Sequence, residues 1–175
     1  MASIINVDNI RAVGSSNTAM TVDSNGYVFP KLPHFNFRSS GTQTIATSTV
    51  TVVTTFDTAT SDTHNFCDTS NSRVQFDSTT AGTYLITYGF KVDNNAPARL
   101  GAWIKTDASS NYIGYFECGG GSVYQHQTWT FMNTFSAGDY IYLVVYQDSG
   151  GNMTFYKGSS TITMGYPHIS GVRIG

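Results

Sequence analysis

The sequence has 175 residues, of which 11% are charged, and its formal net charge at pH 7 is -2. This length suffices for one well-buried core, and the small, balanced charge excludes the basic field of a nucleic-acid-binding protein and the acidic tail of a solvating one. No run approaches the roughly 20 apolar residues that cross a bilayer, and the first residues lack the basic and apolar regions of a secretory signal. We therefore expect neither nucleic acid nor a membrane as a partner.

The composition predicts an all-β chain. Aromatic residues make up 14% of the sequence, and 17 glycines accompany many Thr, Ser and Asn residues. Aromatic and β-branched side chains suit pleated strands, whereas Gly, Asn and Ser suit the tight turns between them. Helical periodicity is not sustained anywhere, so no helix is expected.

Residues 1–32 are expected to form an arm with a short β-hairpin. Asn25-Gly26 is a strong hairpin signal because both residue types tolerate positive φ, and Pro30 and Pro33 bracket a linker because proline discourages ladder pairing. A two-stranded hairpin is barely stable alone in water, so the apolar residues of the arm are expected to anchor it to another protein. These anchor candidates are Ile5, Val7, Ile10, Met20, Val22 and Val28.

Residues 33–175 are expected to form one domain of successive strands. The strand-like runs recur at intervals of roughly 8 to 12 residues and are separated by Gly, Asn and Asp clusters, which is the pattern of an all-β sandwich or barrel. The candidate strands are His34 to Arg38, Thr44 to Phe56, Ser72 to Asp77, Thr83 to Val92, Arg99 to Thr106, Tyr112 to Glu117, Val123 to Phe135, Tyr140 to Gln147, Thr154 to Tyr156 and Ile169 to Ile174.

The candidate strand from Tyr140 to Gln147 is apolar on both faces. Side chains alternate along a strand, so Ile141, Leu143 and Val145 lie on one face. The other face carries aromatic and aliphatic residues where a solvated face would carry polar ones. This second face is formed by Tyr140, Tyr142, Val144 and Tyr146.

The order of five motifs resembles the globular head of the C1q and tumour necrosis factor-like family. These are VVTTFD at residues 52–57, SRVQF at 72–76, AGTYLITYGF at 81–90, AGDYIYLVVY at 137–146 and HISGVRIG at 168–175. The resemblance implies an antiparallel jelly-roll sandwich of about ten strands that assembles as a homotrimer, with one sheet facing the threefold axis.

The N-terminal segment has a second resemblance. The stretch TAMTVDSNGYVFPKLPHF, residues 18–35, is similar to a short module that precedes such heads in structural proteins of marine and freshwater bacteriophages, including those of cyanophage type. The collagen-like stalk of many secreted family members is missing. These features imply a virion component that is made in the cytoplasm of a bacterial host.

The resemblance also assigns a role to the tyrosine-rich face. If the strand from Tyr140 to Gln147 belongs to the sheet that faces the axis, Tyr140, Tyr142, Val144 and Tyr146 point toward neighbouring subunits. Tyrosine suits such a place because its ring buries area while its hydroxyl finds a polar partner. His126 is expected near the same axis, where it would give assembly a weak pH dependence. The alternative is a monomer whose tyrosines lie under a loop or under the N-terminal arm.

No motif in the sequence indicates an enzyme, a cofactor or a metal centre. Glu117 is the only glutamate, whereas glycoside cleavage needs two placed carboxyl groups. The histidines have no metal-ligand spacing, and the run from Asp57 to Asp62 lacks the Gly and Glu of an EF-hand loop. An ion at the top of a trimer, as in some family members, stays open without named ligands. Cys67 and Cys118 either form a bridge or, as two cysteines in a cytosolic product are expected to, remain free.

Two functions fit these features. In the first, the chain is a non-enzymatic, trimeric decoration or cement protein whose arm binds the major capsid protein or another virion protein, with avidity from three copies of each contact. In the second, it is the knob of a tail or head fibre that binds a glycan or protein of the host surface through exposed loops. A length of 175 residues is expected to be too short for the shaft of a tail fibre, which favours decoration. The receptor-facing candidates are Asn94, Asn95, Trp103, Asn111 and Tyr112.

Overall fold

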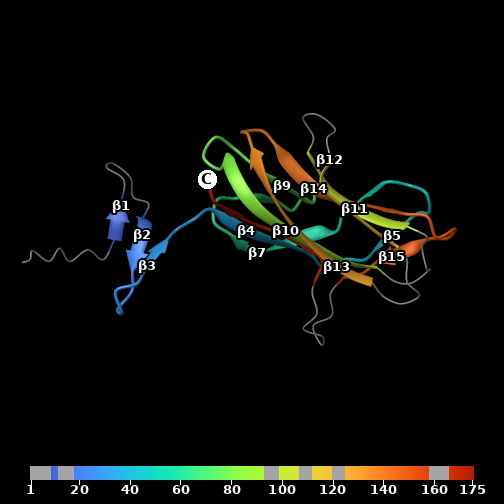
Figure 1. Cartoon of the computed structure of the whole chain (residues 1–175), viewed down its shortest axis with the longest axis horizontal. Coiled ribbons are helices and arrows are strands. Elements are labelled where there is room, and N and C mark those ends of the chain that lie inside the picture. The colour runs from blue at the N-terminus through green and yellow to red at the C-terminus, as the bar shows by residue number, and fades with distance from the viewer. Residues whose placement is uncertain (1–8, 12–17, 93–98, 107–111, 120–124, 158–165) are drawn as a thin grey trace, which may run out of the picture. The chain divides into compact units, whose positions relative to one another are not determined.

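The computed structural model describes residues 9–11, 18–92, 99–106, 112–119, 125–157 and 166–175. Of residues 9–11, 18, 19, 29, 99–106, 115–119, 125 and 126, it describes the backbone only. The chain divides into two compact units, 1–33 and 34–175, each of which is described by itself below (Figure 1). All pairs of described strands are antiparallel. The described residues contain no helix that could cross a membrane.

The N-terminal unit is a three-stranded sheet with the order β1-β2-β3. Its strands are β1 (Asn9–Arg11), β2 (Thr18–Val22) and β3 (Val28–Pro30). The turn between β2 and β3 confirms the predicted hairpin: the carboxylate of Asp23 accepts hydrogen bonds from the backbone N–H groups of Asn25 and Tyr27 at 2.9 Å. Gly26 has φ 83°, a conformation that costs glycine little. Pro30 ends β3, so the linker is shorter than expected.

The larger unit, which we call the head, contains one seven-stranded sheet. Its order is β5-β15-β10-β16-β4-β7. β15 and β16 pair with one edge of β10, and β13 pairs with the opposite edge along the whole length of β10. These strands are β4 (His34–Ser39), β5 (Gln43–Ile45), β7 (Phe56–Asp62), β10 (Gly82–Val92), β13 (Gln125–Phe135), β15 (Met153–Phe155) and β16 (His168–Arg173).

The second sheet of the head has six strands in the order β12-β11-β14-β9-β8, and β6 also pairs with β14. These strands are β6 (Thr51–Val52), β8 (Cys67–Asp68), β9 (Arg73–Gln75), β11 (Arg99–Thr106), β12 (Tyr112–Gly119) and β14 (Tyr140–Gln147). The bounds of β11 and β14 are those predicted from the sequence. The prediction of an antiparallel all-β head is therefore confirmed.

The core between the two sheets is largely aromatic. Ile141, Leu143 and Val145 of β14 belong to it, as expected from the alternation of that strand. The rings of Phe76 and Phe135 are stacked, with centroids 4.2 Å apart and an angle of 4° between their planes. Large rings supply much buried area per residue, which suits a head with short strands. The other fully buried rings are Phe35, Phe37, Phe56, Phe66, Tyr84, Tyr88, Phe90 and Phe155.

The predicted strand from Thr44 to Phe56 was wrong because the chain changes sheets within it. β5 pairs with β15 in one sheet, β6 pairs with β14 in the other, and β7 returns to the first. Ser48 lies between β5 and β6 with φ 55°, and its N–H donates to the carbonyl of Gln147 at 2.6 Å. Thr and Val favour extended backbone, but their propensity does not say which sheet they join. β7 and β8 were missed because their residues are mostly polar.

Candidate functional site

The outer face of the seven-stranded sheet carries an uncharged strip. In β10, Leu85 alternates with the buried residues Tyr84 and Ile86, so its side chain points away from the core and is 42% exposed. It lies opposite Met132 of β13, which is 64% exposed, and opposite Val172 of β16. We define the uncharged strip as Thr83, Leu85 and Thr87 of β10, Thr130, Met132 and Thr134 of β13, and Ser170 and Val172 of β16.

Threonine pairs border the apolar centre of this strip. The hydroxyls of Thr83 and Thr134 are 2.9 Å apart, and those of Thr87 and Thr130 are also 2.9 Å apart. In each pair one hydroxyl donates to the other, so these contacts satisfy part of the hydrogen-bonding capacity of the strip within the sheet. A depression of about 200 Å³ opens beside Leu85, lined by Phe35, Leu85, Thr87, Ser170, Gly171 and Val172.

The uncharged strip was missed at the level of the sequence, although its signal is present. In the run TYLITYGF, Leu85 shares a face with Thr83 and Thr87, opposite the face of Tyr84, Ile86 and Tyr88. An apolar residue on the threonine face is the sign of a covered outer surface.

The tyrosine-rich face belongs to the other sheet. β14 is central in the six-stranded sheet, whose outer face is partly covered by the head's own residues. Val144 is only 1% exposed and lies opposite Val52 of β6. The ring of Tyr140 has the guanidinium of Arg73 at 4.3 Å from its centroid and the ring of Tyr142 at 6.0 Å. Tyr140, Tyr142 and Tyr146 are all half-buried in the single chain.

The residues of the expected trimer interface lie on two different sheets. Tyr140, Tyr142, Val144 and Tyr146 lie on β14, whereas His126 lies on β13 opposite Lys91 of β10, in the seven-stranded sheet. His126 and the tyrosine-rich face therefore belong to different sheets, and their expected position near a threefold axis stays a prediction. Alternation along β14 indicated two apolar faces, but nothing local to this strand shows that β6 and Arg73 cover the second one. The side chain of His126 lies outside the described part of the structure.

The expected receptor-facing residues are also divided. Asn94, Asn95 and Asn111 lie outside the described residues, and for Trp103 only the backbone of β11 is described. Segment 93–98 precedes β11 and segment 107–111 follows it, so they join its opposite ends. Eight residues of strand span about 26 Å at 3.3 Å per residue. Tyr112, at the start of β12, is described and is 49% exposed.

The N-terminal unit exposes its apolar residues. Ile5 and Val7 lie outside the described residues, and Ile10 pairs with Met20 through the backbone of β1 and β2. Met20 and Val28 are 37% and 54% exposed, and Val22 is half-buried. None of residues 20–28 and 30–33, the part of this unit whose exposure is described, is buried. The apolar anchor candidates among them therefore have no core of their own.

Cys67 and Cys118 lie too far apart for a disulfide. Cys67 is on β8 and Cys118 on β12, the two edges of the six-stranded sheet, and three strands separate them. Four steps of about 4.8 Å place the two backbones about 19 Å apart, whereas bridged cysteines need Cα atoms within about 7 Å. Cys67 is a free cysteine. Burial, and secondarily the charge of Asp62, raises the pKa of its thiol.

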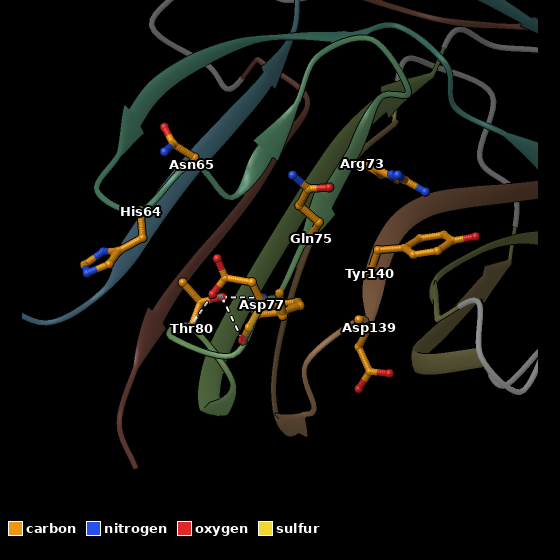
Figure 2. Close-up of a pocket in the computed structure, with 10 residues that line it drawn as sticks. His64, Asn65, Arg73, Gln75, Asp77, Thr80, Asp139 and Tyr140 are labelled. Atoms are coloured by element: carbon orange, nitrogen blue, oxygen red, sulfur yellow. Dashed lines mark hydrogen bonds between the residues drawn. The ribbon is translucent and has the colours of Figure 1, made fainter.

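One end of the head contains a polar pocket of about 350 Å³, which we call the end pocket. In Figure 2, Gln75 lies between Asp77 with Thr80 on one side and Arg73 with Tyr140 on the other. The segments that form it are the connection after β7, strand β9 with the turn that follows it, and the turn between β13 and β14. Its lining residues are His64, Asn65, Arg73, Gln75, Phe76, Asp77, Thr80, Gly138, Asp139 and Tyr140.

The charges around the end pocket are held in place by hydrogen bonds. The Nε atom of Arg73 donates to a carboxylate oxygen of Asp68 at 2.9 Å. Hydrogen bonds from Thr79 and Thr80 lower the pKa of the Asp77 carboxyl to about 2, so this group is ionised at neutral pH. Among the described residues, no group of three or more His, Cys, Asp or Glu side chains is placed to hold a metal ion. The run from Asp57 to Asp62 is strand β7 and not an ion-binding loop.

Comparison with known proteins finds similarity at the level of structure only. No family model and no curated protein matches the sequence. Similarity to the globular domain of zebrafish complement 1qA has a TM-score of 0.54 at 14% identity and covers 82% of this chain and 98% of that one. For Eiger TNF from S. frugiperda the TM-score is 0.58 at 9% identity, with coverage of 82% and 93%. For the PRD1 vertex protein P5 it is 0.55 at 16% identity, with coverage of 82% and 97%.

These similarities establish the class of the head. It has the C1q and TNF-like jelly-roll fold, as the order of sequence motifs implied. The same fold occurs in a bacteriophage vertex protein.

Proposed function

We propose that this chain is a non-enzymatic structural protein of a bacteriophage virion, which assembles as a homotrimer and decorates the capsid through its N-terminal unit. The observation that carries the proposal is the uncharged strip. Leu85, Met132 and Val172 form an apolar row on the outer face of the seven-stranded sheet, where Leu85 and Met132 are 42% and 64% exposed. Charged residues are depleted at the centre of protein interfaces, and this strip has none.

Trimeric assembly is supported by the fold. C1q and TNF-like heads typically assemble as trimers, and the neighbours of this head are of that fold. A second copy of the chain is therefore the partner that we assign to the uncharged strip. A closed ring of subunits covers this face on every copy and leaves no open end for further growth.

Attachment through the N-terminal unit is supported by its exposed apolar residues. A small sheet without a buried residue in its described part gains little stability by itself, and Met20, Tyr27, Val28 and Leu32 are all more than a third exposed. Contact with the major capsid protein or with another virion protein would cover these side chains. Three arms on one trimer would bind a capsid with more avidity than a single arm.

Light scattering coupled to size-exclusion chromatography tests the assembly. We expect the mass of three chains, and a monomer at all concentrations would contradict the proposal. Cryo-electron microscopy of the virion tests the location. Many copies spread over the shell are expected for a decoration protein.

A second candidate function is a receptor-binding knob at a vertex or on the tail. It is supported by the vertex position that the name of the PRD1 protein gives and by the end pocket of the head. A few copies confined to vertices or to the tail would favour this function over decoration.

A further inference from the structure

The end pocket contains carboxylate oxygens that the fold does not use. Only Oδ1 of Asp77 accepts hydrogen bonds within the described residues, from the N–H groups and hydroxyls of Thr79 and Thr80 at 2.8 to 2.9 Å. Likewise, only Oδ2 of Asp139 does so, from the N–H of Ser136 at 2.7 Å. The bonded oxygens hold both carboxylates in position, and the other oxygen of each remains an acceptor for a ligand.

Two amide side chains of the pocket are also available. Asn65 and Gln75 have fixed backbones, since Asn65 sits in the left-handed region at φ 58° and the N–H of Gln75 donates to the carbonyl of Phe66 at 2.8 Å. Their side-chain amides form no hydrogen bond within the described part of the chain. Each amide supplies both donors and an acceptor to the pocket.

An aromatic ring completes the wall. The ring of Tyr140 contacts the guanidinium of Arg73, which is 4.3 Å from its centroid, and the ring of Tyr142, whose centroid is 6.0 Å away. The ring therefore keeps its position whether or not the pocket is occupied. Such pre-organisation reduces the conformational entropy that is lost when a ligand binds.

The charge of the pocket selects against anions. The positive charge of Arg73 is already paired with Asp68, whereas Asp77 and Asp139 have no cationic partner within 4 Å among the described residues. Their negative charge disfavours phosphate, sulfate and carboxylate groups. A neutral ligand that offers hydroxyls can both donate to the carboxylate of Asp77 and accept from the amides of Asn65 and Gln75 (Figure 2).

From this geometry, we propose that the end pocket binds an uncharged saccharide. The sugar hydroxyls would bond to Asp77, Asn65 and Gln75, whereas the carboxylate of Asp139 and the ring of Tyr140 point away from these three side chains (Figure 2). A volume of about 350 Å³ is at the small end of ligand pockets, which suits one or two sugar rings. All lining residues come from one head, so this proposal does not depend on the trimer or on the virion location.

Titration of the isotope-labelled full chain with single sugars tests the proposal. Glucose, galactose, mannose and N-acetylglucosamine are the neutral probes, and glucuronate and glucose 6-phosphate are the anionic ones. We expect at least one neutral sugar to shift the backbone amide signals of Gln75, Gly138 and Tyr140, and the anionic sugars to bind more weakly. No shift with any neutral sugar, or tighter binding of the anionic sugars, would overturn it.

Two variants separate this pocket from other surfaces. Gln75→Ala and Asn65→Gly each remove an amide, and glycine accepts the backbone conformation of residue 65 without strain. Each is expected to weaken binding about 3- to 10-fold, the usual loss for one hydrogen bond. Gln127→Ala, on β13 outside the pocket, is the matched control and should leave binding unchanged. Equal binding by all three variants would refute the assignment.

Discussion

The hydroxyl of Tyr88 donates a hydrogen bond of 2.5 Å to the carbonyl oxygen of Gly114, and this contact joins the two sheets of the head. Tyr88 is fully buried on β10, and Gly114 lies on β12 with φ 63°. The pairing of β11 with β12 is irregular at this position, between Ala102 and Ile104. A glycine in the left-handed conformation is typical of a β-bulge, and here the bulge turns a carbonyl toward the tyrosine.

Replacement of either partner should destabilise the head. Tyr88→Phe leaves the carbonyl of Gly114 without its donor, so we expect a loss of about 1 kcal/mol in the free energy of unfolding. In Gly114→Ala, the new Cβ would lie 2.5 Å from two ring atoms of Phe131 in a conformation that alanine disfavours. We expect a larger loss, about 3 kcal/mol or more, in urea unfolding followed by circular dichroism.

Gly138→Ala is the matched control for this clash. Gly138 also has a positive φ, 93°, but nothing lies within 4 Å of the position of a Cβ atom. Its loss of stability should therefore reflect backbone strain alone and be smaller than that of Gly114→Ala. Equal losses would show that the contact with Phe131 costs nothing.

The assembly should depend on Leu85 and not on Tyr142. Leu85→Asp places a charge in the uncharged strip, so we expect monomers, measured by light scattering at equal protein concentration. The fold should survive because Leu85 is 42% exposed in the single chain. Val52→Asp, at a residue with 38% exposure on the other sheet, is the control and should remain a trimer.

Tyr142→Asp distinguishes a trimer interface on the uncharged strip from one on the tyrosine-rich face, which the sequence indicated. A trimer that survives Leu85→Asp but dissociates with Tyr142→Asp would return the interface to the tyrosine-rich face. Circular dichroism of each variant must first show the spectrum of the folded head, since Tyr142 is half-buried against Tyr140.

Local patterns in the sequence predicted the strands better than their places in the sheets. β11 and β14 begin and end as predicted because turn-forming residues flank each of these runs. In contrast, Ser48 turns the chain from one sheet to the other through a bond to Gln147, about a hundred residues away. That contact depends on the whole fold, and no local signal marks it.

The candidate sites were harder to predict for the same reason. The end pocket gathers Asn65, Gln75, Asp77 and Asp139 from three separate segments. The pairing of β9 with β14 and the hydrogen bond from the N–H of Gln75 to the carbonyl of Phe66 bring these segments together. The uncharged strip likewise needs the register that sets Leu85 opposite Met132. Alternation predicts the two faces of a strand, but not which neighbouring strands complete each face.

The stability of the head should fall in acid because the carboxylate of Asp77 becomes protonated. Hydrogen bonds from Thr79, then from Thr80, lower the pKa of this carboxyl from its ordinary value of 3.8 to about 2 in the folded head. Because the folded state favours the ionised form, the stabilisation is complete above pH 3.8 and is lost as the pH falls toward 2. Unfolding midpoints in urea, measured across this range, should depend less on pH in Asp77→Ala. In Thr79→Val, which lacks one of the hydroxyl donors, the dependence should be intermediate, and an unchanged profile in both variants would contradict this role.

The thiol of Cys67 should react slowly while the head is folded. Burial raises its pKa, and the nearby carboxylate of Asp62 raises it further, so the reactive thiolate is scarce at neutral pH. In a Cys118→Ser background, which leaves one cysteine, we expect maleimide labelling of the native protein to be at least about tenfold slower than in urea, as each unit of pKa alters the thiolate fraction tenfold. Asp62→Asn should speed native labelling only slightly, because burial raises the pKa of the thiol more than the carboxylate does. The carboxylate of Asp62 also accepts a hydrogen bond from the backbone N–H of Cys67. Native labelling as fast as that of the unfolded chain would show that Cys67 is accessible and ionised in the folded head.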